Sequence, residues 1–140
     1  MTAGYSGTPL VRKLGIRPGH RVLVLGAPRG FSLEADDRDR ALLEDVVVQH
    51  RAGSVLYDVV LAFCPDVAAL NQRFARAVGL TPMDGAVWVC WQKKASGLAT
   101  DLDEDGVRAL ALAEGLVDVK VCAVDVVWSG LKLVVRKALR

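Results

Sequence analysis

The sequence predicts an α/β protein in which a mostly parallel sheet of about six strands lies between two layers of helices. Short apolar runs alternate with segments of helical periodicity along most of the 140 residues, and this alternation is typical of parallel sheets. The last two apolar runs follow each other without a helix, which predicts an antiparallel C-terminal strand. No repeat or linker divides the chain, so residues 1–140 are expected to form one Rossmann-like three-layer sandwich.

In the N-terminal half the pattern predicts two helices and three strands. Thr8 is a candidate helix cap and Pro9 suits the first helical position. The segment after the first strand has a very polar first half, so its apolar periodicity is weak. The expected elements are a helix ended by Gly15, strand Arg21–Leu25, helix Leu33–Leu43, strand Val46–Val48 and strand Tyr57–Phe63.

In the C-terminal half, helix signals separate three further strands. Asp66 is the expected N-cap of a helix with one apolar face, and Gly79 suits its end. Thr100-x-x-Asp103 or Asp101-x-x-Glu104 approximates a capping box for the next helix. The expected elements are the helix from Asp66 to Gly79, strand Ala86–Trp91, loop Gln92–Ala99, a helix to Glu114, and strands Val117–Val124 and Leu131–Val135.

Composition argues against several classes of partner. The net charge of +2 is too small to indicate nucleic-acid binding. No apolar run approaches the roughly 18 residues that cross a bilayer, and no signal-peptide pattern opens the chain, so a cytoplasmic protein without a membrane partner is expected. The three cysteines, Cys64, Cys90 and Cys122, are far apart in apolar runs. They are expected to be free and buried, and no metal site is predicted.

The turn after the first strand lies where parallel α/β proteins hold a nucleotide. There, Gly-x-Gly-x-x-Gly lets the backbone approach the ligand closely. Here the turn reads Gly26-Ala27-Pro28-Arg29-Gly30. The second glycine is missing, and Pro28 removes an N–H donor. We therefore expect Gly26 to mark the ligand crevice while neighbouring segments supply most of its chemistry.

Three segments resemble class I S-adenosylmethionine-dependent methyltransferases. Leu14–Gly26 looks like the lead-in to their first motif, Tyr57–Phe63 is similar to their fourth strand, and Leu80–Val89 resembles the turn into their fifth. The closing strand pair matches their antiparallel end. This resemblance implies a Rossmann-like fold and makes S-adenosylmethionine the cofactor to consider.

Departures from that family predict a truncated methyltransferase-like topology in which S-adenosylmethionine is disfavoured. The family's Gly-x-Gly-x-Gly is interrupted after Gly26, and no acidic residue near Gln49 and His50 replaces the family's ribose partner. Only about thirty residues separate Leu25 from Tyr57, which is too few for two strand–helix units. At least one such unit is expected to be missing.

A second resemblance is to a family of small uncharacterised bacterial proteins, a domain of unknown function. It implies the same fold and supplies no activity. The strings that carry it are Tyr5–Leu10 (YSGTPL), Lys93–Gly97 (KKASG) with Thr100–Leu102, Gly115–Asp125, and Trp128–Lys132 (WSGLK).

Ligands of open parallel sheets bind outside the carboxyl ends of the strands. Lys93, Lys94, Ser96 and Gly97 follow one such strand and combine two ammonium groups, a hydroxyl and a flexible glycine, which suits an anion. The alternative is that both lysines are merely solvated. The segments expected to meet at this edge are Gly26–Gly30, Cys64–Asp66, Trp91–Gly97 and Tyr5–Thr8.

Tryptophans and the last hairpin supply the remaining candidates. Trp91 and Trp128 suit stacking on an aromatic ligand, although packing in the core is the commoner role, and Trp88 is expected in the core. Asp125, Ser129 and Lys132 are expected to add polar groups near the last hairpin or to fix it by hydrogen bonds. His20 and His50 have no partners that indicate catalysis.

Three functional hypotheses follow from these patterns. The leading one is binding of a small anionic metabolite or nucleotide at the carboxyl edge of the sheet. A reduced S-adenosylmethionine-dependent methyltransferase is the first alternative. A non-catalytic scaffold or interaction protein is the second. The sequence names neither a catalytic residue nor an oligomeric state.

Overall fold

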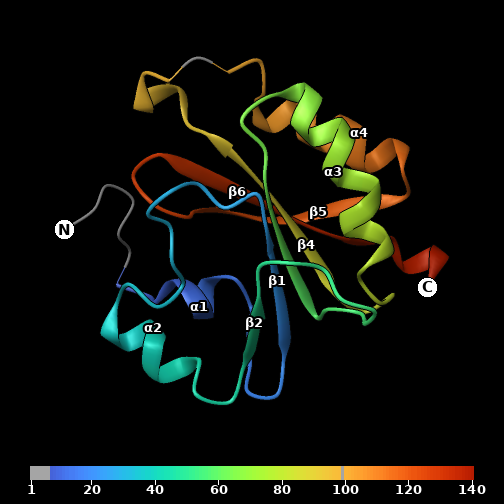
Figure 1. Cartoon of the computed structure of the whole chain (residues 1–140). Helices are drawn as coiled ribbons and strands as arrows, with labels where there is room; N and C mark the ends of the chain where they lie inside the picture. Colours follow the sequence, from blue (N-terminus) through green and yellow to red (C-terminus); the bar gives the residue numbers. More distant parts are fainter. Residues whose placement is uncertain (1–6, 99) are drawn as a thin grey trace.

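The computed structural model describes residues 7–98 and 100–140, which form a six-stranded sheet with helices on both faces (Figure 1). The strand order is β2-β1-β3-β4-β6-β5. The strands are β1 (Arg21–Leu25), β2 (Val47–Gln49), β3 (Val59–Phe63), β4 (Ala86–Gln92), β5 (Leu116–Ala123) and β6 (Trp128–Val135). The helices are α1 (Leu10–Lys13), α2 (Asp37–Leu42), α3 (Val67–Gly79) and α4 (Glu104–Ala113), with 3-10 turns at Lys94–Ser96 and Lys137–Leu139.

The sheet is parallel on one side and antiparallel on the other. β1 pairs in parallel with β2 and β3, and β3 pairs in parallel with β4. β6 runs antiparallel to both β4 and β5. Only β2 and α2 lie between β1 and β3 along the chain, as the short spacing predicted. The predicted fold class is therefore confirmed, including the antiparallel C-terminal strand and the truncation.

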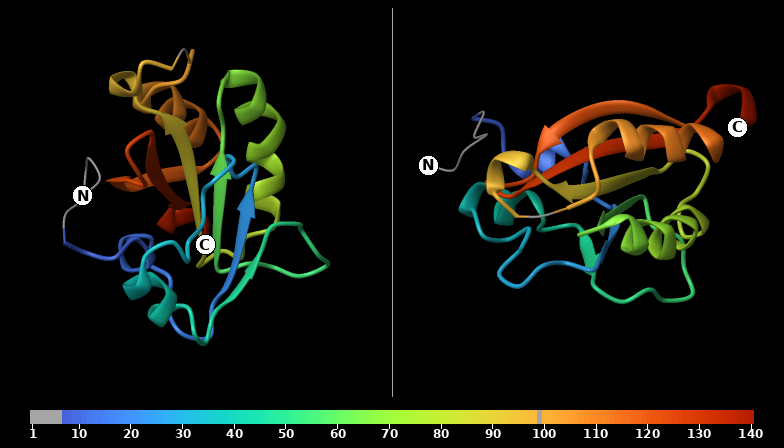
Figure 2. Two further views of the ribbon diagram at one scale, coloured as in Figure 1. Left: turned by 60° about the vertical axis from the view of Figure 1, so that its left-hand side comes forward. Right: turned by 90° about the horizontal axis from the view of Figure 1, so that it is seen from above.

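Two apolar layers hold the helices to the sheet (Figure 2). The layer beneath α3 and α4 includes Leu70, Phe74 and Trp91. The opposite layer, beside α1 and α2, includes Leu14 and Trp88. The side chains of Val59–Phe63 in β3 and Ala86–Trp91 in β4 are all at most 7% exposed, so both strands are buried on both faces. Fully covered parallel strands explain the continuous apolar runs in the sequence.

The N-terminal helices are shorter than predicted. α2 starts at Asp37 rather than Leu33, and its N-cap is Asp36, whose carboxylate accepts a hydrogen bond from the Arg38 amide. The polar segment before it has no apolar face to dock and remains a loop. Capping of α1 by Thr8 was a wrong prediction, because its N-cap is Pro9 and no side chain caps it. Pro9 has extended backbone angles and lies just outside the helix.

Two expected features of the later helices have different outcomes. Asp66 is the N-cap of α3 and accepts a hydrogen bond from the Ala69 amide, as predicted. α4 begins later than the capping box suggested, with Asp103 as its N-cap. Thr100 and Asp101 instead bond to the segment that begins α3: Thr100 donates to the Pro65 carbonyl, and Asp101 accepts from the Val67 amide. The segment that was predicted only to cap α4 therefore also ties the start of α4 to the start of α3.

β6 begins three residues before its predicted start. The Asp125 carboxylate accepts hydrogen bonds from the amides of Val127 and Trp128, at 2.8 and 2.7 Å, and closes a short turn after β5. Strand pairing therefore resumes at Trp128. Within the described ranges 7–98 and 100–140, no helix combines the length and apolar character needed to cross a membrane.

Candidate functional site

The crevice between the carboxyl ends of β1 and β3 is filled by an arginine. Strand order reverses here, so it is where an open α/β sheet usually binds its ligand. Arg73 reaches over from α3 and its guanidinium donates a hydrogen bond to the Phe63 carbonyl. The same group lies against Gly26, where an added Cβ would be 2.7 Å from Arg73 Nη1. Gly26 follows β1 at its carboxyl end and Arg73 lies against it, and a part for Gly26 in ligand binding stays a prediction.

The end of β2 is also engaged within the chain. Gln49 Oε1 accepts a 2.6 Å hydrogen bond from the Tyr57 hydroxyl, and that hydroxyl accepts one from the Gly53 amide. Tyr57 is fully buried. Gln49 therefore anchors the loop between β2 and β3, at the place where the methyltransferase resemblance would put a carboxylate for a ribose.

Aromatic side chains close the crevice on the α1 face. The ring of Phe63 lies 4.7 Å from that of Phe31 and 5.2 Å, edge-on, from that of Trp128. Trp128 packs in this layer, whereas Trp91 packs in the layer under α3. Both tryptophan side chains are 6% exposed, so both pack in the core, which was the alternative prediction. Stacking of either one on an aromatic ligand stays a prediction. Trp88 is in the core as predicted, and its indole N–H donates to the Leu14 carbonyl.

The Lys93–Gly97 segment forms a closed turn beside the β5–β6 turn. Lys93 Nζ donates to the Asp125 carbonyl at 2.7 Å, and Ser96 Oγ donates to the Lys93 carbonyl at 2.6 Å. Gly97 ends the 3-10 turn with φ +76°. Lys94 is exposed. The structure therefore brings Lys93 to the expected edge, while Ser96 and Gly97 shape their own turn; anion binding by this loop stays a prediction.

Two further predictions concern the N-terminal segment Tyr5–Thr8 and Lys132. Tyr5 and Ser6 lie outside the described residues. Lys132 does not lie near the β5–β6 turn, because β6 carries it away toward the amino ends of the parallel strands, where it pairs with Trp88 and Lys120. Lys132 thus lies in the last hairpin, as expected, but within its strand and away from its turn, and a part in ligand binding stays a prediction.

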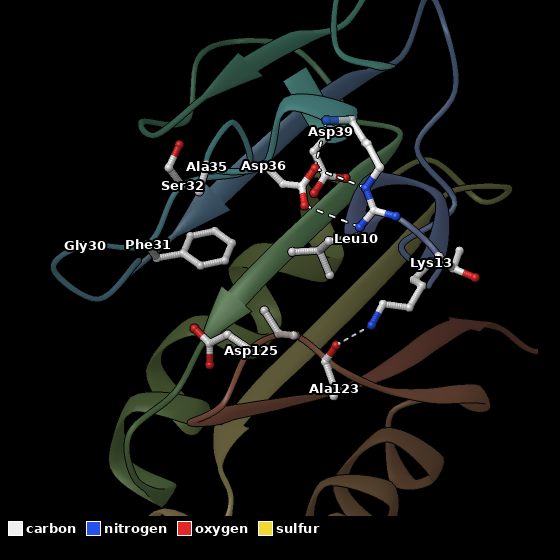
Figure 3. Close-up of a pocket in the computed structure, with 13 residues that line it drawn as sticks. Leu10, Lys13, Gly30, Phe31, Ser32, Ala35, Asp36, Asp39, Ala123 and Asp125 are labelled. Carbon is white, nitrogen blue, oxygen red and sulfur yellow. Dashed lines mark hydrogen bonds and ion pairs between the residues drawn. The ribbon is translucent and has the colours of Figure 1, made fainter. Parts of the chain in front are cut away.

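An open cavity of about 360 Å³ lies next to the filled crevice, between the segment before α2, helix α1 and the β5–β6 turn (Figure 3). Its volume is within the range of small-molecule sites. Lys13 reaches from α1 toward Ala123, while Asp36 and Asp39 lie together at the other end. The lining residues are Thr8, Leu10, Lys13, Gly30, Phe31, Ser32, Ala35, Asp36, Arg38, Asp39, Ala123, Val124 and Asp125.

The three carboxylates of this cavity are all engaged by donors of the chain. Asp39, only 6% exposed, accepts a 2.8 Å hydrogen bond from the Val11 amide and so holds α2 against α1. Asp36 accepts from the Arg38 amide and guanidinium, and these hydrogen bonds lower the pKa of Asp36. Asp125 accepts from the two amides that close its turn. Each carboxylate is thus committed to local structure.

Lys13 is the cation of this cavity that has no carboxylate partner. Its ammonium donates to the Ala123 carbonyl at 3.0 Å, and no ion pair involves it among residues 7–98 and 100–140. An ammonium has three donors, so two remain for a ligand. Sequence reasoning missed Lys13, Asp36 and Asp39 because the cavity that they line forms only where α1 packs against α2. No local signal marks that contact.

Comparisons with known proteins identify the fold. No protein-family model and no curated protein matches this chain. Among solved structures it is similar to TrmN from Thermus thermophilus, with 20% identity, a TM-score of 0.54, and coverage of 91% of this chain and 47% of that one. It is also similar to magnesium protoporphyrin IX methyltransferase (ChlM) from Synechocystis PCC 6803 with bound SAM, with 16% identity, a TM-score of 0.57, and 91% and 74% coverage. The fold is that of the methyltransferases.

Some of these structures extend well beyond the region that matches this chain. The pyocyanin biosynthetic protein PhzM matches with 12% identity and a TM-score of 0.59, over 90% of this chain and 53% of its own. The chain thus spans about half the length of TrmN and of PhzM. The methyltransferase resemblance is confirmed at the level of the fold, and membership of the uncharacterised bacterial family stays a prediction.

Proposed function

We propose that this protein binds a small anionic metabolite in the cavity between the segment before α2, helix α1 and the β5–β6 turn. The observation that carries the proposal is Lys13, a half-buried ammonium without a carboxylate partner among the described residues, in a cavity of about 360 Å³. A charged donor in a partly desolvated cavity binds an anion more strongly than a neutral donor would. The ligand is expected to place its carboxylate or phosphate at Lys13.

The rest of the cavity limits what the ligand can be. Hydroxyls of Thr8 and Ser32 line it and provide neutral hydrogen-bonding groups. The carboxylates of Asp36 and Asp39 at the far end, and that of Asp125 at the β5–β6 turn, disfavour a second negative charge on the ligand. A compact ligand with one anionic end and a neutral or donor-bearing end fits this distribution, whereas a polyphosphate does not.

Lys93 contributes to the same site indirectly, because it holds the β5–β6 turn. Lys13 donates to the Ala123 carbonyl and Lys93 to the Asp125 carbonyl, so the two ammonium groups hold this turn through neighbouring carbonyls. Both lysines add positive potential where the anion is proposed to bind. In this proposal Lys93 favours anion binding through its positive potential and not through the direct contact that the sequence predicted.

A reduced S-adenosylmethionine-dependent methyltransferase is the second candidate. It is supported by the fold, which is shared with methyltransferases that include one solved with bound SAM. Arg73 in front of Gly26 and the Gln49–Tyr57 hydrogen bond count against it, because both use groups at the edge where that cofactor would bind. Anion binding beside α1 needs no rearrangement of the crevice, so we favour it.

Thermal-shift and calorimetric measurements on the full chain test the proposal. The panel contains glycolate, citrate, inorganic phosphate, AMP, S-adenosylmethionine and S-adenosylhomocysteine. At least one small anion is expected to raise the melting temperature, and Lys13→Met is expected to weaken its binding about tenfold, which is the loss of one charge-assisted hydrogen bond. Lys13→Arg keeps the charge and should retain binding.

Lys137→Met is the matched control, because Lys137 is exposed and does not line this cavity. It should leave binding unchanged. No shift with any small anion, or equal binding by wild type and Lys13→Met, would overturn the proposal. Binding of S-adenosylmethionine alone, insensitive to Lys13→Met, would favour the methyltransferase alternative.

A further inference from the structure

A second polar cavity, of about 300 Å³, lies at the opposite edge of the sheet, where the parallel strands begin. It is bounded by the end of α1, the turn before β1, and the turn before β4. It has no residue in common with the cavity proposed above, and α1 separates the two. The ionisable residues that line it are Arg17, His20, Asp58, Asp84 and Lys132.

Lys132 is the half-buried cation of this cavity, and none of the ion pairs of the described residues involves it. It lies in the middle of β6, and within the described ranges its ammonium makes no hydrogen bond or ion pair. An added Cβ on Gly15, whose φ is +75°, would lie 3.4 Å from Lys132 Nζ, so the ammonium rests against the backbone at the end of α1. A partly desolvated, unpaired ammonium favours an anion beside it.

A second lysine on the neighbouring strand makes an anion beside Lys132 more favourable. Lys132 is paired in register with Lys120 on β5. Side chains directly opposite on neighbouring strands share a face, and like charges there are destabilising. The Lys120 ammonium donates to the Lys13 carbonyl, whereas Lys132 lines the cavity. An anion bound at Lys132 would offset this repulsion.

Two further donors come from the turn before β1. The Arg17 amide donates to His20 Nδ1 at 3.1 Å, and so in the neutral imidazole the proton is on Nε2, which is free to donate. The Arg17 side chain is exposed and forms no ion pair among the residues that the structure describes. The cavity thus offers an ammonium, a guanidinium and an imidazole N–H.

The carboxylates of the cavity define the other end of the ligand. Asp58 Oδ2 accepts the Arg21 amide at 2.8 Å, and Oδ1 has no hydrogen-bond partner in the described chain. Asp84 is exposed in the turn before β4. These oxygens accept hydrogen bonds and repel a plain anion. A ligand with an acidic group at one end and an N–H or O–H donor at the other satisfies both sets of groups.

We propose that this second cavity, at the amino ends of the parallel strands, is a second binding site, which takes a small amino acid or hydroxy acid. The ligand carboxylate binds Lys132, with Arg17 and His20 as further donors, and its amino or hydroxyl group donates to Asp58 or Asp84. This site is independent of the anion site beside α1.

Titrations of the ¹⁵N-labelled full chain with L-serine, glycolate, inorganic phosphate and ethanolamine test the proposal. L-serine or glycolate is expected to shift the amide signals of Gly15, His20 and Gly85 in a saturable way. Lys132→Met, which keeps most of the side-chain stem, should weaken that binding about tenfold. Lys137→Met is the matched control and should bind as wild type does.

Arg17→Gln gives a second test that does not depend on a residue within the sheet. It should weaken binding of the same acid, whereas Arg29→Gln, in the exposed turn at the other edge, should not. The proposal is overturned if neither acid gives saturable shifts at these amides, or if Lys132→Met and Arg17→Gln both bind as wild type does. Saturable binding of phosphate or ethanolamine in place of the acids would overturn the assigned ligand class.

Discussion

The crevice at the ends of β1 and β3 and the cavity beside α1 share one edge of the sheet but are built in opposite ways. In the crevice, Arg73, Gln49 and Phe63 each contact another part of the chain, and together they leave the usual ligand position filled. In the cavity, the ammonium of Lys13 keeps donors to spare. The comparison teaches that side chains, rather than the strand order, decide where a Rossmann-like sheet is open to a ligand.

The largest expected effect is on the aromatic packing that closes the crevice. Phe63 is fully buried between Phe31 and Trp128. Phe63→Ala should lower the free energy of unfolding by about 3–5 kcal/mol, because it removes a large side chain and leaves a cavity. Urea unfolding followed by tryptophan fluorescence measures this. Phe31→Ala, at a half-buried position, should cost clearly less. A loss below about 1 kcal/mol for Phe63→Ala would mean that the crevice is not closed by packing.

The next effect concerns Gly26 and its arginine neighbour. Gly26→Ala combines a φ of +66° with a Cβ 2.7 Å from Arg73 Nη1 and 3.1 Å from the Phe63 carbonyl oxygen, so a loss of about 1–3 kcal/mol in unfolding free energy is expected, mostly from backbone strain and in smaller part from displacement of the flexible guanidinium. Gly30→Ala is the control, because φ is +86° there but nothing lies within 4 Å of an added Cβ; it should show the backbone strain alone. In an Arg73→Ala background the extra cost of Gly26→Ala should disappear. Equal losses at Gly26 and Gly30 would contradict a filled crevice.

A smaller effect is expected on the chemistry of Cys64, which follows β3 at the closed crevice. Burial raises the pKa of Cys64 to about 11. At pH 8 about one thiol in a thousand is therefore ionised, and alkylation by iodoacetamide should be slow in the native protein and fast in urea. Mass spectrometry of the modified peptides measures the rates. Because the Arg73 guanidinium lowers the pKa of Cys64 against the effect of burial, Arg73→Ala should reduce the ionised fraction and slow modification of native Cys64, whereas Cys90, which is fully buried, should be unaffected. Rapid labelling of native Cys64 would show that the crevice is open.

The smallest effect is a dependence of stability on alkaline pH. Because the folded pKa of Cys64 is raised, from 9.0 to about 11, its thiol ionises first in the unfolded chain. The free energy of unfolding should therefore hold below pH 9 and fall as pH rises toward 11. Cys64→Ala should make this fall shallower in chemical denaturation at pH 8, 9 and 10. An unchanged slope would show that Cys64 is not the group responsible.

Local pattern was sufficient for the strands and for some helix ends. The apolar runs Arg21–Leu25 and Tyr57–Phe63 predicted β1 and β3 because a strand buried on both faces needs continuous apolar sequence. Asp66 predicted the start of α3 because capping depends on residues three apart. The polar stretch after Gly30 was assigned to a helix that begins later, since composition alone does not show which segment finds an apolar surface.

The sequence by itself determined the fold class, the antiparallel end, the truncation and the edge at which Gly26 and Lys93 lie. Only the tertiary structure decided that Arg73 fills the expected crevice, that Lys13 reaches Ala123, and that Lys132 stands at the opposite edge. The reason is physical. Strands and caps are fixed by neighbours a few residues away, whereas Lys13 and Ala123 are 110 residues apart, and their meeting depends on how α1 packs on the sheet.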